Sequence, residues 1–133
     1  MPEGIGLIIE DYNHTLLLHL RDEHAPSLKN EWCLIGGSVE SGETLETAAL
    51  RELKEEINLS SQEVISFFTT FIKEDTQKTI HIFHVIVDTR QQQMILGEGK
   101  DLKFMTKDEI LKLISGITKP NQYLLALRQF IEK

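Results

Sequence analysis

The sequence predicts an α/β fold, in which strands and helices follow one another along the chain. Apolar runs rich in β-branched residues recur between turn-forming residues, as is typical of buried strands. Other segments repeat apolar residues at the three- and four-residue spacing of amphipathic helices. With 133 residues, 41% of them hydrophobic and 26% charged, the chain is long enough for one core. We therefore expect a single domain over 1–133.

The first third of the chain predicts a hairpin and a short strand. Apolar runs at 6–9 and 16–20 flank the turn-forming residues 11–14, which favours two buried strands joined by a turn. The run 32–35 predicts another strand, ending at Gly36-Gly37. Two adjacent glycines allow the backbone to approach a ligand or an ion closely, so Gly37 is a candidate substrate-binding residue.

The polar segment 21–30 contains a proline and predicts a surface loop. It carries three cations, Arg21, His24 and Lys29, which precede the acidic part of the chain. Either these side chains contact a phosphate group or they are solvated. Arg21 is the strongest candidate for binding substrate.

The second half of the chain predicts two strands, a third strand and two helices. The runs 64–72 and 79–87 are rich in β-branched and aromatic residues and are separated by a polar turn, which favours an antiparallel pair. A short strand is expected over 102–105. Thr106 and Glu109 form a capping-box pattern that opens a helix ending near 114, and a last helix follows Pro120.

Between these halves, a glycine-containing loop leads into one helix. Thr44 is a suitable N-cap for a helix that extends to about Ile57. Leu50, Leu53 and Ile57 are spaced at i, i+3 and i+7, which predicts the stripe that packs inward. A different face of the same helix would then be available for chemistry.

Three carboxylates occupy that other face. Glu52, Glu55 and Glu56 stand at i, i+3 and i+4, where like charges on a helix repel one another. A hard divalent cation would remove this cost, and oxygen ligands suit Mg²⁺, with Mn²⁺ as the usual substitute. The alternative interpretation is a solvated acidic face, as most charge clusters on helices are.

The full spacing around these glutamates is long and unusual. Gly37 is followed after five residues by Glu43, and after seven more by the run Arg51-Glu52-Leu53-Lys54-Glu55-Glu56-Ile57-Asn58-Leu59. This pattern resembles the Nudix box. In two places the sequence departs from it, because Asn58 stands where the family usually has glycine and Ile35 where a proline commonly precedes the glycines. Asparagine is the best non-glycine residue in a left-handed helix end, so the first departure is mild.

The resemblance implies a fold and a set of roles. The fold would be an α/β/α sandwich around a mixed β-sheet. The metal ligands would be Glu52, Glu55 and Glu56 together with the Gly36 carbonyl, and Glu43 and Arg51 would brace the loop against the helix. The carboxylates that take part in catalysis would be Glu52, Glu55 and Glu98, the last on a loop that approaches the metal.

The implied activity is hydrolysis of a diphosphate linkage. Such a reaction needs neutralised phosphate oxygens and an activated water, and divalent metals supply both. We predict Mg²⁺-dependent attack of water on a nucleoside diphosphate derivative, with Glu52 or Glu98 as the proton acceptor. Nucleoside triphosphates, including oxidised ones, are the leading substrates, cleaved to a monophosphate and pyrophosphate. Nucleotide sugars, ADP-ribose and dinucleoside polyphosphates are the alternatives.

The composition of the chain limits the kinds of partner that we expect it to bind and the cellular compartment in which we expect it. The formal net charge of −7 disfavours nucleic-acid binding through a basic surface, capped RNA included. Cys33 is the single cysteine, so an intrachain disulfide is excluded and a reducing cytoplasm is favoured. The first residues do not resemble a signal peptide, and no membrane partner is expected. The predicted protein is a cytoplasmic monomer or homodimer that binds a small nucleotide.

A protein of another class remains as an alternative hypothesis. The domain would then be a nucleotide-binding sensor that has lost catalysis. Retired enzymes typically lose their carboxylates first, whereas Glu52, Glu55 and Glu56 are all present here. Binding of a nucleotide without release of phosphate would favour the sensor.

Overall fold

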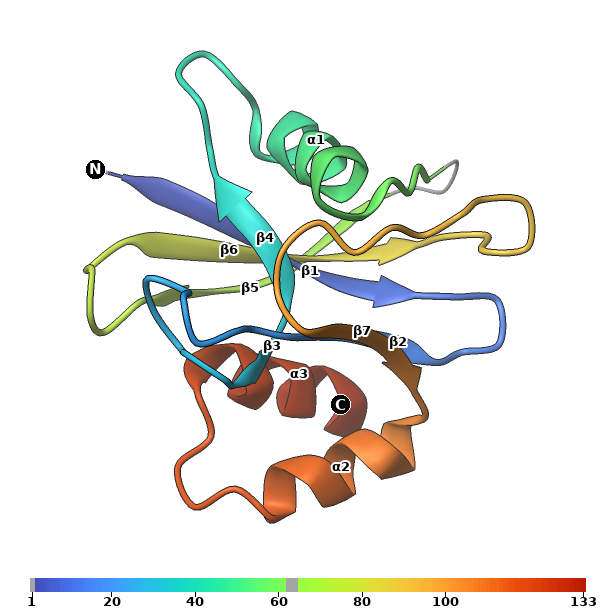
Figure 1. Cartoon of the computed structure of the whole chain (residues 1–133). Helices are drawn as coiled ribbons and strands as arrows, with labels where there is room; N and C mark the ends of the chain where they lie inside the picture. The colour runs from blue at the N-terminus through green and yellow to red at the C-terminus, as the bar shows by residue number, and fades with distance from the viewer. Residues whose placement is uncertain (1, 62–64) are drawn as a thin grey trace.

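A mixed β-sheet lies between helices on its two faces (Figure 1). The computed structural model describes residues 2–61 and 65–133, so the expected strand start at Val64 lies outside the described residues. The elements are β1 (Glu3–Glu10), β2 (Leu16–Leu20), β3 (Trp32–Cys33), β4 (Ile35–Ser38), α1 (Leu45–Ile57), β5 (Ser66–Ile72), β6 (Thr79–Ile86), β7 (Asp101–Met105), α2 (Lys107–Ser115) and α3 (Gln122–Glu132).

The sheet is organised around β1. Its main path runs β3-β2-β1-β6-β5, with β4 pairing to β1 and β7 pairing to β2. Among the described strands, β1 and β6 run parallel and the other pairs run antiparallel. Because β1 is covered on both faces, residues 4–10 are all buried, and the strand has the continuous apolar run of a central strand rather than an alternating one.

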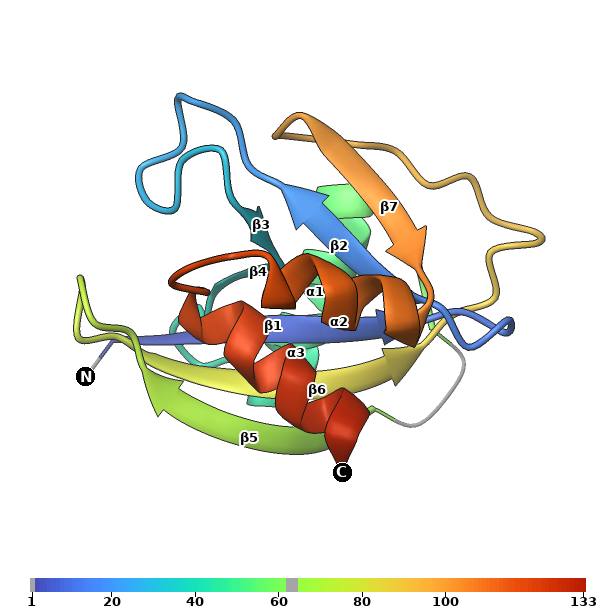
Figure 2. The same cartoon turned by 90° about the horizontal axis from the view of Figure 1, so that it is seen from below.

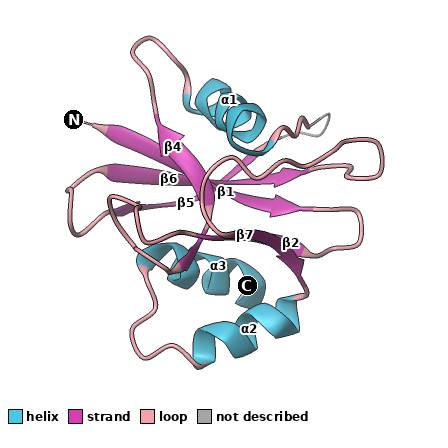
Figure 3. Ribbon diagram, viewed as in Figure 1, coloured by secondary structure: helices cyan, strands magenta, loops and turns pink. Residues whose placement is uncertain are grey.

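The helices form two separate layers (Figure 2). In the view from below, α2 and α3 cross in front of the sheet and α1 lies behind it. Successive side chains of β1 therefore enter different cores: Leu7 packs on the α1 side with Leu53, and Ile8 packs on the other side with Ile110 and Leu127. Figure 3 shows the same α/β/α layering, and the expected fold is confirmed.

The helix α1 begins and ends as its sequence predicts. Thr44 is the N-cap and accepts a hydrogen bond from the Thr47 amide, while Asn58 has the left-handed conformation, with φ 61°. The inward stripe differs from the expected one. Leu50 is 42% exposed, and the buried residues of this face include Ala49 and Leu53. The small Ala49, one position earlier, faces the sheet and turns Leu50 towards solvent.

The two glycines lie within a strand rather than after it. The strand expected over 32–35 is instead two strands, β3 and β4, and β4 passes through both glycines. Gly36 pairs with Gly6 of β1, and a Cβ atom on Gly36 would lie 2.1 Å from the Ile5 carbonyl oxygen. This close approach of two backbones requires glycine, so here glycine continues the sheet.

The C-terminal helices and the cysteine agree with expectation. Thr106 and Glu109 form the complete capping box of α2, and Asn121 caps α3. Cys33 is buried, and burial raises the pKa of its thiol to about 11, so it packs as a small apolar residue. None of the helices in the described part of the chain has the length and apolar character needed to cross a membrane.

Candidate active site

The carboxylate of Glu52 lies directly against Gly37. Glu52 is 6% exposed, although it projects from α1, and a Cβ atom on Gly37 would lie 2.4 Å from its carboxyl group. Any larger residue at position 37 would displace that carboxylate. The glycine of β4 and the glutamate of α1 therefore form one unit, and the contact of α1 with β4 holds it in place.

Arg51 connects the loop before α1 to the helix. Its Nε and Nη2 atoms donate to both carboxylate oxygens of Glu43 at 2.6 and 3.0 Å, in the bidentate arrangement. Nη2 also donates to the Ser38 carbonyl at 2.9 Å. Nη1 donates to Glu52 at 2.8 Å and to Glu55 at 3.1 Å. One guanidinium thus fixes the end of β4, the loop and two of the helix carboxylates.

The carboxylates of the site fall into two groups. The protein stabilises the ionised form of Glu43, whereas it disfavours the ionised forms of Glu52 and Glu56. Hydrogen bonding from Arg51 lowers the pKa of Glu43 to about 2. Burial raises the pKa of Glu52, and Arg51 only partly offsets it. The pKa of Glu56 is also raised, first by burial and then by the nearby Glu98 carboxylate. Arg21 only partly offsets the negative charge near Glu56, so the pKa of this carboxyl stays raised.

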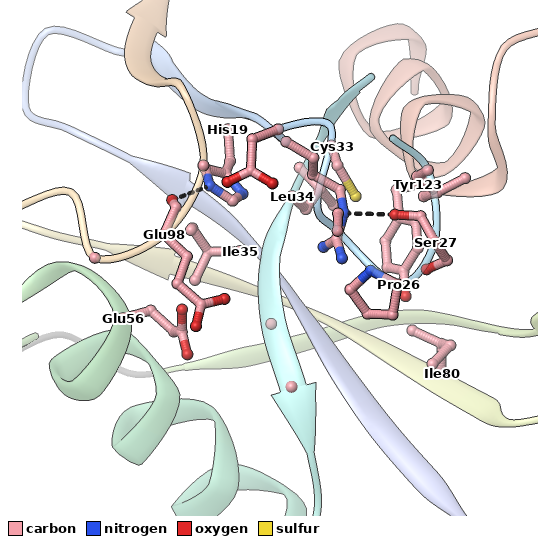
Figure 4. A pocket seen from close by; sticks show the side chains of 18 of the residues that line it. His19, Pro26, Ser27, Cys33, Leu34, Ile35, Glu56, Ile80, Glu98 and Tyr123 are labelled. Carbon is pink, nitrogen blue, oxygen red and sulfur yellow. Dashed lines mark hydrogen bonds between the residues drawn. The ribbon is translucent and has the colours of Figure 1, made fainter. Parts of the chain in front are cut away.

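A cavity of about 740 Å³ opens beside these carboxylates (Figure 4). Glu56 and Glu98 lie on one side of β4, whereas Ser27 and Tyr123 lie on the other. Backbone of the glycine pair forms part of the lining between them. The cavity is thus acidic at one end and bordered at the other by the 21–30 loop and α3.

The chain is similar to known proteins in sequence and in fold. The NUDIX domain matches residues 2–127. The chain belongs to this family. An RNA pyrophosphohydrolase of Sulfurovum sp. is 38% identical over 126 residues, covering 83% of this chain and 80% of the relative. Its Nudix domain belongs to the class of hydrolases that act on pyrophosphate bonds.

Other known proteins match only part of this chain in sequence, or share its fold at low sequence identity. The m7GpppN-mRNA hydrolase NUDT17 of Xenopus laevis is 41% identical over 61 residues, which cover 46% of this chain and only 21% of that protein. The MutT protein of Methanosarcina mazei Go1 has a TM-score of 0.71 at 22% identity, covering 98% of this chain and 90% of the other. An Ap4A hydrolase of C. elegans has a TM-score of 0.69 at 22% identity, covering 98% of each.

The structure brings together most of the residues that the Nudix resemblance singles out. Glu52 and Glu56 are near one another, and Glu98 approaches Glu56 from the loop before β7. Glu55 is different, because its side chain is 58% exposed and points to Arg51. Glu43 pairs with the same arginine.

The loop cations separate into two groups. Arg21 lines the cavity, and its Nε donates to the Ser27 carbonyl at 2.9 Å. His24 also borders the cavity, but its side chain is 86% exposed and its imidazole faces Glu23. Lys29 is exposed and lies outside the residues that line this cavity. The expectation that Arg21 is the best-placed of the three is consistent with this arrangement.

The carboxylates of the site have the donor atoms that a divalent cation prefers. Glu52, Glu56 and Glu98 offer oxygen atoms, the donors that Mg²⁺ prefers, and the raised pKa values of Glu52 and Glu56 show that negative charge there is costly. Over 2–61 and 65–133, no three acidic, histidine or cysteine side chains converge into a ready-made metal site. Glu55 is exposed and can exchange its Arg51 contact for another by a change of rotamer. The donor chemistry therefore fits the cation.

Several cavity residues were not found from the sequence. His19 Nε2 donates to the Glu98 carbonyl at 2.7 Å, which fixes the loop that carries Glu98. Lys73 and Lys78 flank the β5–β6 turn and also line the cavity. A histidine within a strand and lysines beside a turn are common surface features, and only the tertiary fold brings them to the site.

The arginine brace leads to a testable expectation. Replacing Arg51 with methionine keeps most of the apolar stem but removes every hydrogen bond of the guanidinium. We expect a clear drop in the urea midpoint, because Glu43 and the Ser38 carbonyl lose their partner. We also expect a fall in activity, since Glu52 loses its orienting contact. Arg90→Met is the matched control: the Arg90 side chain is 70% exposed in its pair with Asp88, so the midpoint should move much less. Equal midpoints for both variants would contradict the brace.

Proposed function

We propose that this chain hydrolyses the diphosphate linkage of a nucleoside diphosphate derivative in a reaction that depends on Mg²⁺, with Mn²⁺ as a substitute. One observation carries the proposal: carboxylates of α1 and of the Glu98 loop, whose negative charge nearby arginines offset only in part, meet at one end of a cavity large enough for a nucleotide. Family membership supports the class of reaction, and the cavity beside these carboxylates supports the proposed location.

Each residue of the site then has a proposed role. Glu52, Glu55 and Glu56 hold the cation, with the Gly36 carbonyl as a further donor. When bound, Mg²⁺ neutralises phosphate oxygens and lowers the pKa of the attacking water. The proton of that water passes to Glu52 or Glu98, of which Glu52 is buried against Gly37 and Glu98 is exposed on its loop. Glu43 and Arg51 hold the loop before α1 in a fixed position against the helix.

Several substrates fit this reaction. Nucleoside triphosphates, oxidised ones included, would be cleaved to a monophosphate and pyrophosphate. Nucleotide sugars, ADP-ribose and dinucleoside polyphosphates are the alternatives, the last supported by the fold shared with an Ap4A hydrolase. The relative named as an RNA pyrophosphohydrolase adds RNA as a candidate. The acidic balance of the chain argues against it, since RNA binding relies on cations that follow the backbone.

A panel of these nucleotides, assayed with Mg²⁺, with Mn²⁺ and with chelator, tests the proposal. We expect phosphorus-containing products only when a metal is present, and chromatography of the products identifies which phosphorus is attacked. Incubation in ¹⁸O-labelled water confirms hydrolysis by placing the label on one product. Tight nucleotide binding with no phosphate release under any condition would instead indicate the retired sensor.

A further inference from the structure

We infer that Arg21, Lys73 and Lys78 form an anion-binding site for phosphate groups beyond the diphosphate linkage that is cut. The substrate class would then be nucleoside triphosphates or longer polyphosphates, rather than nucleotide sugars or ADP-ribose. This inference rests on the proposed function and makes it more specific. These three residues are called the distal cations below.

The distal cations come from separate segments and converge on one cavity. Arg21 follows β2, Lys73 follows β5, and Lys78 precedes β6. Lys73 donates from Nζ to Ser27 Oγ at 2.9 Å, and Arg21 donates to the carbonyl of the same serine. Both therefore contact Ser27, which lies across β4 from Glu56 and Glu98 (Figure 4). Lys78 donates from Nζ to Ser38 Oγ at 2.6 Å, at the end of β4.

The positive charge of these residues is poorly compensated. Their side-chain hydrogen bonds go to neutral oxygen atoms, the carbonyl and hydroxyl of Ser27 and the hydroxyl of Ser38. Within the described segments, neither Arg21 nor Lys78 has a carboxylate partner within 4.0 Å. Lys73 has one, Asp75, at 4.0 Å and itself half exposed. Asp22, Glu56 and Glu98 line the same cavity, but in the described segments none of them forms an ion pair with these cations within 4.0 Å, and Arg21 acts on Glu56 only from a longer distance.

Burial of the Lys73 side chain makes its positive charge unfavourable. The Lys73 side chain is only 18% exposed, and a largely buried ammonium needs an anion or several hydrogen bonds to offset its lost hydration. An ammonium has three donors and a guanidinium five, and the hydrogen bonds given above use one on each residue. The remaining donors, together with the charge, suit the oxygen atoms of a phosphate group.

The placement of the distal cations determines which substrates benefit from them. The reacting linkage lies at the acidic end by the proposed function, and β4 separates that end from Ser27 (Figure 4). A polyphosphate extended across β4 would place a further anionic group near the cations. A nucleotide sugar or ADP-ribose would place an uncharged sugar there and gain little from them. The site would therefore favour the triphosphate.

The test uses Lys73→Met and Lys78→Met, singly and together, because methionine keeps an apolar stem and removes the charge. Kinetics with Mg²⁺ are measured on ATP and on ADP-glucose. For ATP we expect the double variant to raise KM by at least about 10-fold with little change in kcat, since two charge-assisted hydrogen bonds to the bound phosphate are lost. For ADP-glucose we expect little change. Lys112→Met, on the exposed face of α2 and away from the cavity, is the matched control.

A second measurement separates this inference from the proposed function. Inorganic tripolyphosphate is titrated into the metal-free protein in a calorimeter, so no turnover is needed. We expect the double variant to bind it at least about 10-fold more weakly than the unmodified chain and the Lys112→Met control. Thermal melting confirms that each variant is folded. Unchanged tripolyphosphate affinity, or an equal rise in KM for ATP and ADP-glucose, would overturn the anion site. Failure of the unmodified chain to hydrolyse either nucleotide would count against the proposed function alone.

Discussion

Glu56→Gln is expected to abolish metal-dependent turnover while the protein stays folded. Glutamine has nearly the same shape as glutamate but carries no charge, so the cation loses one of its proposed ligands. We expect kcat/KM to fall by more than about 100-fold, because even residues that only support metal ligands typically cost 10–100-fold. Glu55→Gln should also inactivate the enzyme, since it removes another proposed ligand.

The stability of the Glu56→Gln variant is an independent check. The pKa of Glu56 is raised, first by burial and then by Glu98, so the ionised form is less favourable in the folded chain than in the unfolded one. A group of this kind lowers stability at neutral pH, and the cost disappears once the carboxyl is protonated. The neutral amide should therefore leave the metal-free melting temperature unchanged or raise it.

The measurements are initial rates on the preferred nucleotide and thermal melting by circular dichroism without metal. Glu46→Gln is the matched control, because Glu46 is exposed in the first turn of α1 and outside the cavity. It should keep full activity. Full activity in both Glu55→Gln and Glu56→Gln would refute the assignment of these carboxylates.

Gly36→Ala is expected to cause a large loss in the free energy of unfolding. The new Cβ would lie 2.1 Å from the Ile5 carbonyl oxygen and 3.0 Å from the Gly6 Cα. Both are backbone atoms of the central strand, which cannot move without breaking the pairing of β1 with β4. We expect a loss of at least about 3 kcal/mol, the upper part of the range for overpacked cores.

Urea unfolding of the two proteins measures this loss. Gly116→Ala serves as the control: its Cβ would lie 3.5 Å from the nearest atom, an ordinary contact, and its backbone is in the helical region with φ −83°. That variant should match the parent in stability. A Gly36→Ala protein with an unchanged midpoint would show that β1 and β4 are not packed as closely as described.

The features that could be predicted from the sequence are local ones. The helix with its caps at Thr44 and Asn58 follows from neighbouring residues, because a cap depends on side chains within a few positions. The crowding of Glu52 and Glu56 follows from helical spacing in the same way. The choice of family came from the full spacing between Gly37 and Leu59, since no single part of that stretch is specific.

The features that could not be predicted depend on contacts between distant segments. Leu50 has the spacing of a core residue, but the packing of α1 on the sheet leaves it exposed. Lys73 and Lys78 reach the cavity only because β6 pairs with β1, and that pairing leaves no trace in their immediate sequence. His19 similarly contacts a loop that lies 79 residues away in the chain.

The position of β1 has a consequence for the order in which the chain can fold. Glu3 aligns with Thr79 and Glu10 with Ile86, so the parallel partner of the central strand is synthesised long after the strand itself. On the ribosome, β1 and β2 emerge as an apolar hairpin with one long edge unpaired. A nascent chain that ends before β6 should therefore bind chaperones and be cleaved readily by protease, because the edge of β1 that pairs with β6 stays open. Protection should appear abruptly, when β6 emerges and docks beside β1.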